Sequence, residues 1–156
     1  MEAFRAKSVT SIHGGKSIKC RVDFEMRSLI VDVENCLQAF VGVAHNLNSI
    51  IVAIRGTQEN SVQNWIKDLV WKQLDLSYPD MPNAKVHSGF FSSYNNTILR
   101  LAITSDVHNA RKTYGDIGVI VTGHSMGGAM AAFCALDLAV STQDPMFHKY
   151  IQCPDS

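Results

Sequence analysis

The chain has 156 residues, of which 46% are hydrophobic, a size that suits one globular domain and not two full ones. Its 14 basic and 14 acidic residues give a formal net charge of zero at pH 7, which argues against nucleic acid as a partner. We find neither an apolar leader nor a run long enough to be a transmembrane segment, and the four cysteines have no C-x-x-C spacing. These features predict a cytoplasmic chain with free thiols.

The N-terminal part of the chain predicts strands after an irregular start. Residues 1–28 are largely polar and lack a firm periodicity, so we expect a poorly determined N-terminal arm. Residues 29–33 favour a short strand. Two apolar runs, residues 38–43 and 49–55, then flank the polar segment 45–48, a pattern typical of a hairpin.

The middle of the chain predicts helices. Asn60 can cap a helix with Gln63 three residues further on, and the apolar residues that follow have the i, i+3, i+4, i+7 spacing of one helix face. The apolar face of this helix consists of Val62, Trp65, Ile66 and Leu69. After a proline-containing loop, residues 87–114 predict a helix that is either continuous or broken near residues 102–105. The glycosylation sequon Asn95-Asn96-Thr97 falls in this helix, and in a cytoplasmic chain we expect it to be unused.

The most informative stretch is Gly123-His124-Ser125-Met126-Gly127, which has the G-x-S-x-G pattern of a nucleophile elbow. Residues 117–122 before it are typical of a strand buried on both faces of a parallel sheet, and residues 126–140 after it predict a buried helix. A serine that projects from so tight a turn leaves no room for neighbouring side chains, so Gly123 and Gly127 are the glycines the elbow requires. Strands that alternate with helices predict an α/β sheet whose last strand is parallel.

Four blocks of sequence, in this order, resemble the successive signatures of the class 3 lipase family, the fungal and plant α/β-hydrolase lipases. They are Ile51-Val52-Ala53-Ile54-Arg55-Gly56-Thr57, Asn64-Trp65-Ile66-Lys67-Asp68-Leu69, Val86-His87-Ser88-Gly89-Phe90 and Gly123-His124-Ser125-Met126-Gly127-Gly128-Ala129. The resemblance covers residues 29–140, about the N-terminal half of that family's catalytic domain, and leaves residues 141–156 as an unrelated tail. It implies an incomplete, C-terminally truncated α/β-hydrolase sheet with helices on both faces.

The resemblance also implies a serine hydrolase of carboxylic esters, typically acylglycerols, that needs no metal and no cofactor. Ser125 is similar to the family's nucleophile, while Thr57 and Met126 match the two positions of its oxyanion hole. The helix around Trp65 matches the family's lid, so its apolar face would meet substrate or lipid. The implied partners are a lipid or ester substrate and, peripherally, a lipid interface.

The same chemistry needs an acid and a histidine that follow the serine in chain order. In the family both lie on loops beyond the point at which the resemblance ends. His148 is the only histidine after Ser125, and Asp144 and Asp155 lie in the same short segment, which we expect to be too short to return over the elbow. His124 adjoins the serine, but we expect it to pack beneath the turn.

We therefore expect a truncated class 3 lipase-like hydrolase that lacks the triad acid and base and is weakly active or inactive, a candidate pseudoenzyme. Two alternatives stay open: a non-catalytic lipid-binding or interaction module, and an incomplete product with no function of its own. The elbow strand is central in a doubly wound hydrolase sheet, so a truncated chain would expose an apolar edge. We expect self-association through that edge.

Overall fold

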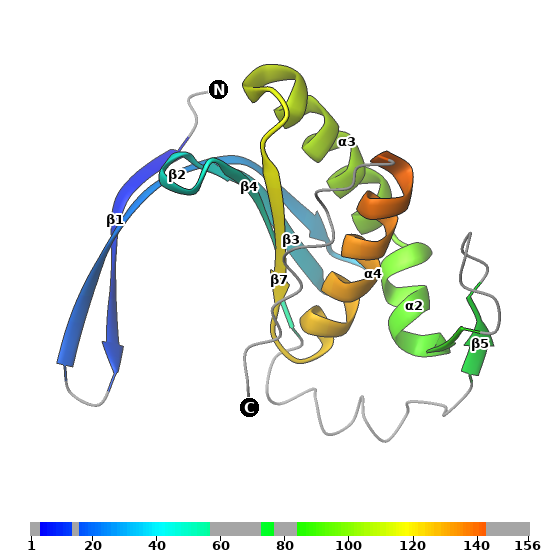
Figure 1. Cartoon of the computed structure of the whole chain (residues 1–156). Helices are drawn as coiled ribbons and strands as arrows, with labels where there is room; N and C mark the ends of the chain where they lie inside the picture. Colours follow the sequence, from blue (N-terminus) through cyan, green and yellow to red (C-terminus); the bar gives the residue numbers. More distant parts are fainter. Residues whose placement is uncertain (1–3, 14–15, 57–72, 77–83, 143–156) are drawn as a thin grey trace.

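The computed structural model describes residues 4–13, 16–56, 73–76 and 84–142. The larger of its two sheets has the strand order β1-β2-β3-β4-β7 (Figure 1). These strands are β1 (Phe4–His13), β2 (Lys16–Asp32), β3 (Leu37–Ala44), β4 (Ser49–Ile54) and β7 (Gly118–Gly123). Neighbours from β1 to β4 are antiparallel, whereas β7 is parallel to β4. The predicted hairpin of β3 and β4 and the predicted parallel strand before the elbow are both confirmed.

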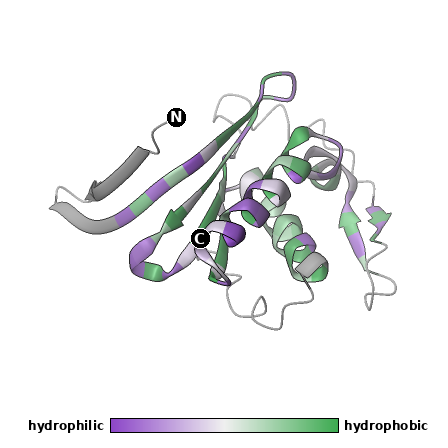
Figure 2. Ribbon diagram, turned by 90° about the horizontal axis from the view of Figure 1, so that it is seen from above, coloured by the Kyte–Doolittle hydropathy of each residue, from purple (hydrophilic) through white to green (hydrophobic). Residues whose placement is uncertain are grey.

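Strands β1 and β2 form a long hairpin where we expected a poorly determined arm. The hairpin extends away from the rest of the sheet, and β2 continues without a break to Asp32, past the boundary expected at residue 28 (Figure 1). Its last residues include the short strand predicted from residue 29. Along the part of β2 coloured in Figure 2, hydrophilic and hydrophobic residues alternate, which is the pattern of a strand with one exposed face.

The three described α-helices lie on one face of the main sheet (Figure 1). Helices α3 (Ile98–Tyr114) and α4 (Met126–Thr142) pack against the strands, and α2 (Ser88–Asn95) packs against both helices. The side chains beneath them are fully buried, for example Val41 and Val52, which face each other across β3 and β4. On the opposite face of β2, Leu29 and Val31 are 59% and 43% exposed.

The helical segment after β6 (Lys85–His87) breaks between α2 and α3, at Asn96 and Thr97, and not near residues 102–105. Thr97 ends one helix and caps the next: its backbone angles are extended, and its hydroxyl accepts a hydrogen bond from the Leu99 N–H. Such a cap satisfies a backbone donor at the start of α3. The short strand β5 (Gln73–Asp75) pairs with β6 beside α2.

A partly buried ion pair joins α3 to α4. Arg100 Nε and Nη2 lie 2.6 and 3.2 Å from the two carboxylate oxygens of Asp137, whose side chain is 8% exposed. Two parallel hydrogen bonds of this kind fix orientation as well as distance. The pair therefore holds α4, the helix that follows the candidate nucleophile, against the helix that precedes β7.

Candidate active site

Ser125 stands in the turn between β7 and α4, at the end of the sheet where β4 also finishes. Its φ angle is 55°, in the left-handed region that residues with a Cβ rarely adopt. The turn is closed by hydrogen bonds from Gly127 N to His124 O and from Gly128 N to Ser125 O, both 2.9 Å. A strained backbone at an exposed serine is the geometry expected for a nucleophile presented at the top of a sheet.

The structure shows why both glycines of the pattern are needed. A Cβ at Gly123 would lie 2.2 Å from the Gly127 carbonyl oxygen, and one at Gly127 would lie 2.3 Å from the Ile54 carbonyl oxygen. Because these obstacles are backbone atoms, they cannot rotate away. The start of α4 therefore lies directly against the last residue of β4 as well as against its own strand.

Gly56 makes a third close approach that sequence reasoning did not identify. A Cβ there would meet the His124 carbonyl oxygen at 2.5 Å and the Ser125 Cβ at 3.6 Å. Two sequence signals could have marked this glycine: it lies just after a strand, and it belongs to the first of the four lipase-like blocks. Its position brings the chain beside Ser125 one residue before Thr57, the candidate second oxyanion donor, which lies outside the described residues.

The described residues hold only part of the site expected from the sequence. Met126, the candidate first oxyanion donor, begins α4 and is 7% exposed, so its backbone is next to Ser125 at the helix N-terminus. The four residues of the expected lid face, Val62, Trp65, Ile66 and Leu69, lie outside the described residues. So do the substitutes considered for the triad, Asp144, His148 and Asp155.

Two other titratable side chains of the described part of the chain, Asp137 and His87, make structural contacts. Asp137 is bound to Arg100, and the His87 ring nitrogen Nδ1 accepts a hydrogen bond from Gly89 N at 3.2 Å, which caps α2. His124 is exposed and does not pack beneath the elbow, which corrects our expectation. The cause is the turn itself, because its interior is filled by backbone atoms of the glycines and β4.

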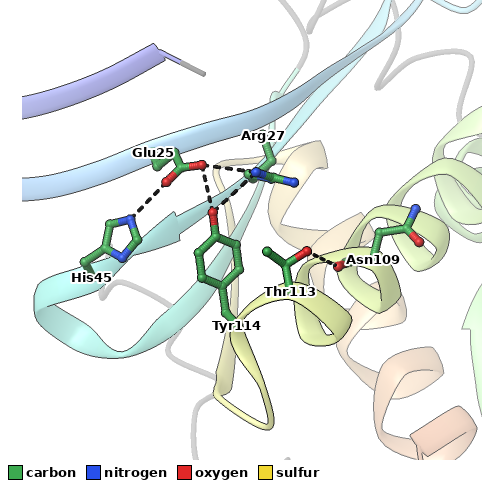
Figure 3. Close-up of polar contacts among 6 residues, drawn as sticks. All are labelled: Glu25, Arg27, His45, Asn109, Thr113 and Tyr114. Atoms are coloured by element: carbon green, nitrogen blue, oxygen red, sulfur yellow. Dashed lines mark hydrogen bonds and ion pairs between the residues drawn. The ribbon is translucent and has the colours of Figure 1, made fainter. Parts of the chain in front are cut away.

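Figure 3 shows a polar cluster around Glu25. The strand register places it beside the start of β4, at the opposite end of the sheet from Ser125. The Tyr114 hydroxyl donates to Glu25 Oε1 at 2.8 Å, Arg27 Nη1 lies 3.2 Å from the same oxygen, and His45 Nε2 lies 3.1 Å from Oε2. The hydrogen bond from Tyr114, with those from Arg27 and His45, lowers the pKa of Glu25 below its ordinary value of 4.5. Burial and the Glu25 contact raise the pKa of Tyr114. The cluster fastens the end of α3 to β2, far from the elbow.

Two general features complete the description of the site. Among the described residues, no three or more histidine, cysteine, aspartate or glutamate side chains are grouped so that they could hold a metal ion. No helix of the described part of the chain has the length and apolar character needed to cross a membrane.

A mixed sheet, a glycine-flanked serine at φ 55° and a helix that starts at the next residue together match the strand–turn–helix arrangement of the α/β-hydrolase class. The comparisons with known proteins give the family. The family described as lipase (class 3) matches residues 51–153, about two thirds of the sequence, and the chain belongs to this family. The match reaches beyond residue 140, into the segment that we expected to be an unrelated tail.

Relatives in sequence and structure are fungal lipases. The chain is 41% identical over 100 residues to a lipase of Rhizomucor miehei, a match that covers 64% of this chain and 26% of the relative. It is 33% identical over 109 residues to secreted mono- and diacylglycerol lipase 2 of Gibberella zeae, covering 60% and 26%. A solved triacylglycerol lipase, whose catalytic centre is formed by a serine protease triad, is 33% identical with a TM-score of 0.64, covering 76% and 43%.

Two consequences follow from these comparisons. The chain spans about a quarter of the length of the curated relatives it matches. The expectation of a cytoplasmic protein is wrong, because relatives such as that of Gibberella zeae are secreted lipases and point to an extracellular protein. The prediction rested on the absence of an apolar leader and of C-x-x-C spacing in the sequence, and neither feature decides the compartment.

Proposed function

We propose that this chain carries the nucleophile and the oxyanion-binding part of a secreted class 3 lipase that hydrolyses carboxylic esters of acylglycerols. The observation that carries the proposal is the strained Ser125 turn at the N-terminus of α4 in a member of this family. Relatives that act as mono- and diacylglycerol lipases support the substrate class and the extracellular location.

The chemistry follows from the position of Ser125. Its oxygen attacks the ester carbonyl carbon, and the tetrahedral oxyanion is stabilised by the backbone N–H of Met126 and by Thr57. The alcohol leaves, an acyl-enzyme forms, and water then releases the fatty acid. Support for Thr57 is indirect: it follows Gly56, whose backbone lies against the elbow.

The general base and its acid are not present in the described part of the chain after the elbow. Between residues 126 and 142, Asp137 is the only carboxylate, it is bound to Arg100, and no histidine occurs. We therefore propose that the chain alone is weakly active, because loss of a triad member lowers turnover by about 10⁴ and Ser125 then attacks the ester slowly, without a base.

The test is hydrolysis of a short-chain nitrophenyl ester by the purified chain, by Ser125→Ala and by the surface control Ser105→Ala. We expect a slow rate that Ser125→Ala abolishes and Ser105→Ala leaves unchanged. Equal rates in the parent and in Ser125→Ala would refute the nucleophile. Fast turnover that depends on Ser125 would show that the chain supplies its own base, with His148 as the first candidate.

A further inference from the structure

The junction between α2 and α3 carries the one Asn-X-Ser/Thr sequence of this chain, Asn95-Asn96-Thr97. Sequence periodicity places it inside a helix, but the structure places it at a break. Asn95 is the last residue of α2, Asn96 is exposed, and Thr97 caps α3. The sequon is therefore at a turn on the surface, which is the setting of N-glycan acceptors in secreted proteins.

The two ends of the Asn95 amide have different surroundings. Its carbonyl oxygen Oδ1 accepts a hydrogen bond from Arg100 Nη1 at 2.7 Å, in a partly buried position. Its nitrogen Nδ2 donates to Asn96 Oδ1 at 2.8 Å, in an exposed position. Arg100 is in turn held by Asp137. The amide is thus anchored by its oxygen and presents its nitrogen, the atom that carries an N-glycan, to the outer side.

We propose that Asn95 is an N-glycosylation site of this chain, an inference that rests on the secretion included in the proposed function. In the reaction a bond forms between Asn95 Nδ2 and C1 of a sugar, and the bond from C1 to the phosphate oxygen of a polyprenyl-diphosphate oligosaccharide breaks. One Nδ2 proton passes to the transferase and the polyprenyl diphosphate leaves. The product keeps Oδ1, so the hydrogen bond from Arg100 is retained and only the exposed contact with Asn96 is exchanged.

The site stands next to an apolar part of the surface. Ile98 and Leu101, in the first turn of α3, are 51% and 77% exposed. A glycan on Asn95 would project from the surface just before α3 begins, which would place a hydrophilic group beside these side chains. The unglycosylated chain is therefore expected to associate more readily than the glycosylated one.

The test expresses the whole 156-residue chain behind a cleavable secretion leader in yeast and treats the total product with endoglycosidase H. We expect a mobility shift of one glycan in the parent, with the modified peptide identified by mass spectrometry at Asn95. Asn95→Gln and Thr97→Ala should lose the shift. Asn96→Gln and Thr97→Ser should keep it, because both preserve the sequon, and Thr97→Ser also preserves the capping hydroxyl.

Each outcome decides the proposal. A parent without an endoglycosidase-sensitive shift, or a shift that persists in Asn95→Gln, overturns it. The leader delivers the chain to the transferase whatever its natural location. The readout is a mobility shift, so it does not depend on ester hydrolysis. A glycosylated chain without Ser125-dependent hydrolysis would refute the proposed activity alone, and an active chain without the shift would refute the glycan alone.

Discussion

Replacement of Gly127 by alanine is the sharpest test of the packing that positions Ser125. A Cβ at this position would lie 2.3 Å from Ile54 O, 2.8 Å from Arg55 C and 2.9 Å from Gly56 N. An ordinary contact between carbon and a carbonyl oxygen is about 3.3–3.6 Å, so α4 and the end of β4 must separate by about 1 Å. Three backbone atoms block the Cβ, and no side-chain rotation relieves the contact.

Two opposing effects determine how much Gly127→Ala changes the free energy of unfolding. Overpacking of this severity costs about 3 kcal/mol, the upper part of the usual range, while alanine gains about 1 kcal/mol over glycine in a helix. The net loss of about 2 kcal/mol in the free energy of unfolding corresponds to a melting temperature lower by about 4–8 °C for a chain of this size. A matched control is Gly118→Ala, where the nearest atom is Ser49 Oγ at 3.1 Å, an atom of a side chain that can shift.

Thermal unfolding followed by far-ultraviolet circular dichroism measures both variants against the parent. We expect the melting temperature of Gly127→Ala to be lower than that of the parent by about 4–8 °C. We expect Gly118→Ala to change the free energy of unfolding by less than about 1 kcal/mol. Equal melting temperatures for Gly127→Ala and the parent would refute the argument. So would a larger loss in Gly118→Ala, because the obstacle would then not be the backbone of β4.

Three further predictions concern acid stability, lipid contact and assembly. Because the folded pKa of Glu25 is below 4.5, its contacts stabilise the fold above that pH and are lost as the pH falls through the folded value; Tyr114→Phe should flatten this decline in urea titrations, and parallel pH curves would refute it. In a Ser125→Ala background, Trp65→Ala should weaken association with lipid emulsions, measured by flotation, and equal binding would remove the lid face from the proposal. Among the described strands, β7 pairs with β4 alone, so we expect the chain to dimerise or aggregate through this edge; a monomeric mass in light scattering together with a cooperative melt above about 55 °C would contradict it.

Local patterns were sufficient for the elements that carry the candidate nucleophile. The strand, turn and helix around Ser125 were predicted because glycine spacing and apolar runs are properties of neighbouring residues. The hairpin of β3 and β4 was predicted for the same reason. The strand–turn–helix unit and the hairpin each depend on contacts between residues that are close together in the sequence.

Features that depend on distant contacts or on a single cap were missed. The Thr97 cap that divides α2 from α3 is one hydroxyl in a segment whose periodicity suits a continuous helix. The cluster at Glu25 draws on Arg27, His45 and Tyr114, which three separate elements bring together. The β1–β2 hairpin was missed because its residues are largely polar and offer no apolar run.

The parallel pairing of β4 with β7 has a consequence for how the site is made. It joins residues 49–54 to residues 118–123, so the helices α2 and α3 must be synthesised and folded back before the two strands can meet. Such nonlocal pairing forms slowly, because the entropy of closing a long loop is lost before the contacts are gained. Gly56 packs against the turn at Ser125, and Gly127 packs against the end of β4. The turn at Ser125 can therefore adopt its strained conformation only after β4 and β7 have paired. An unfinished chain would therefore hold Ser125 without its strained turn, and the geometry of the candidate site would form late in folding.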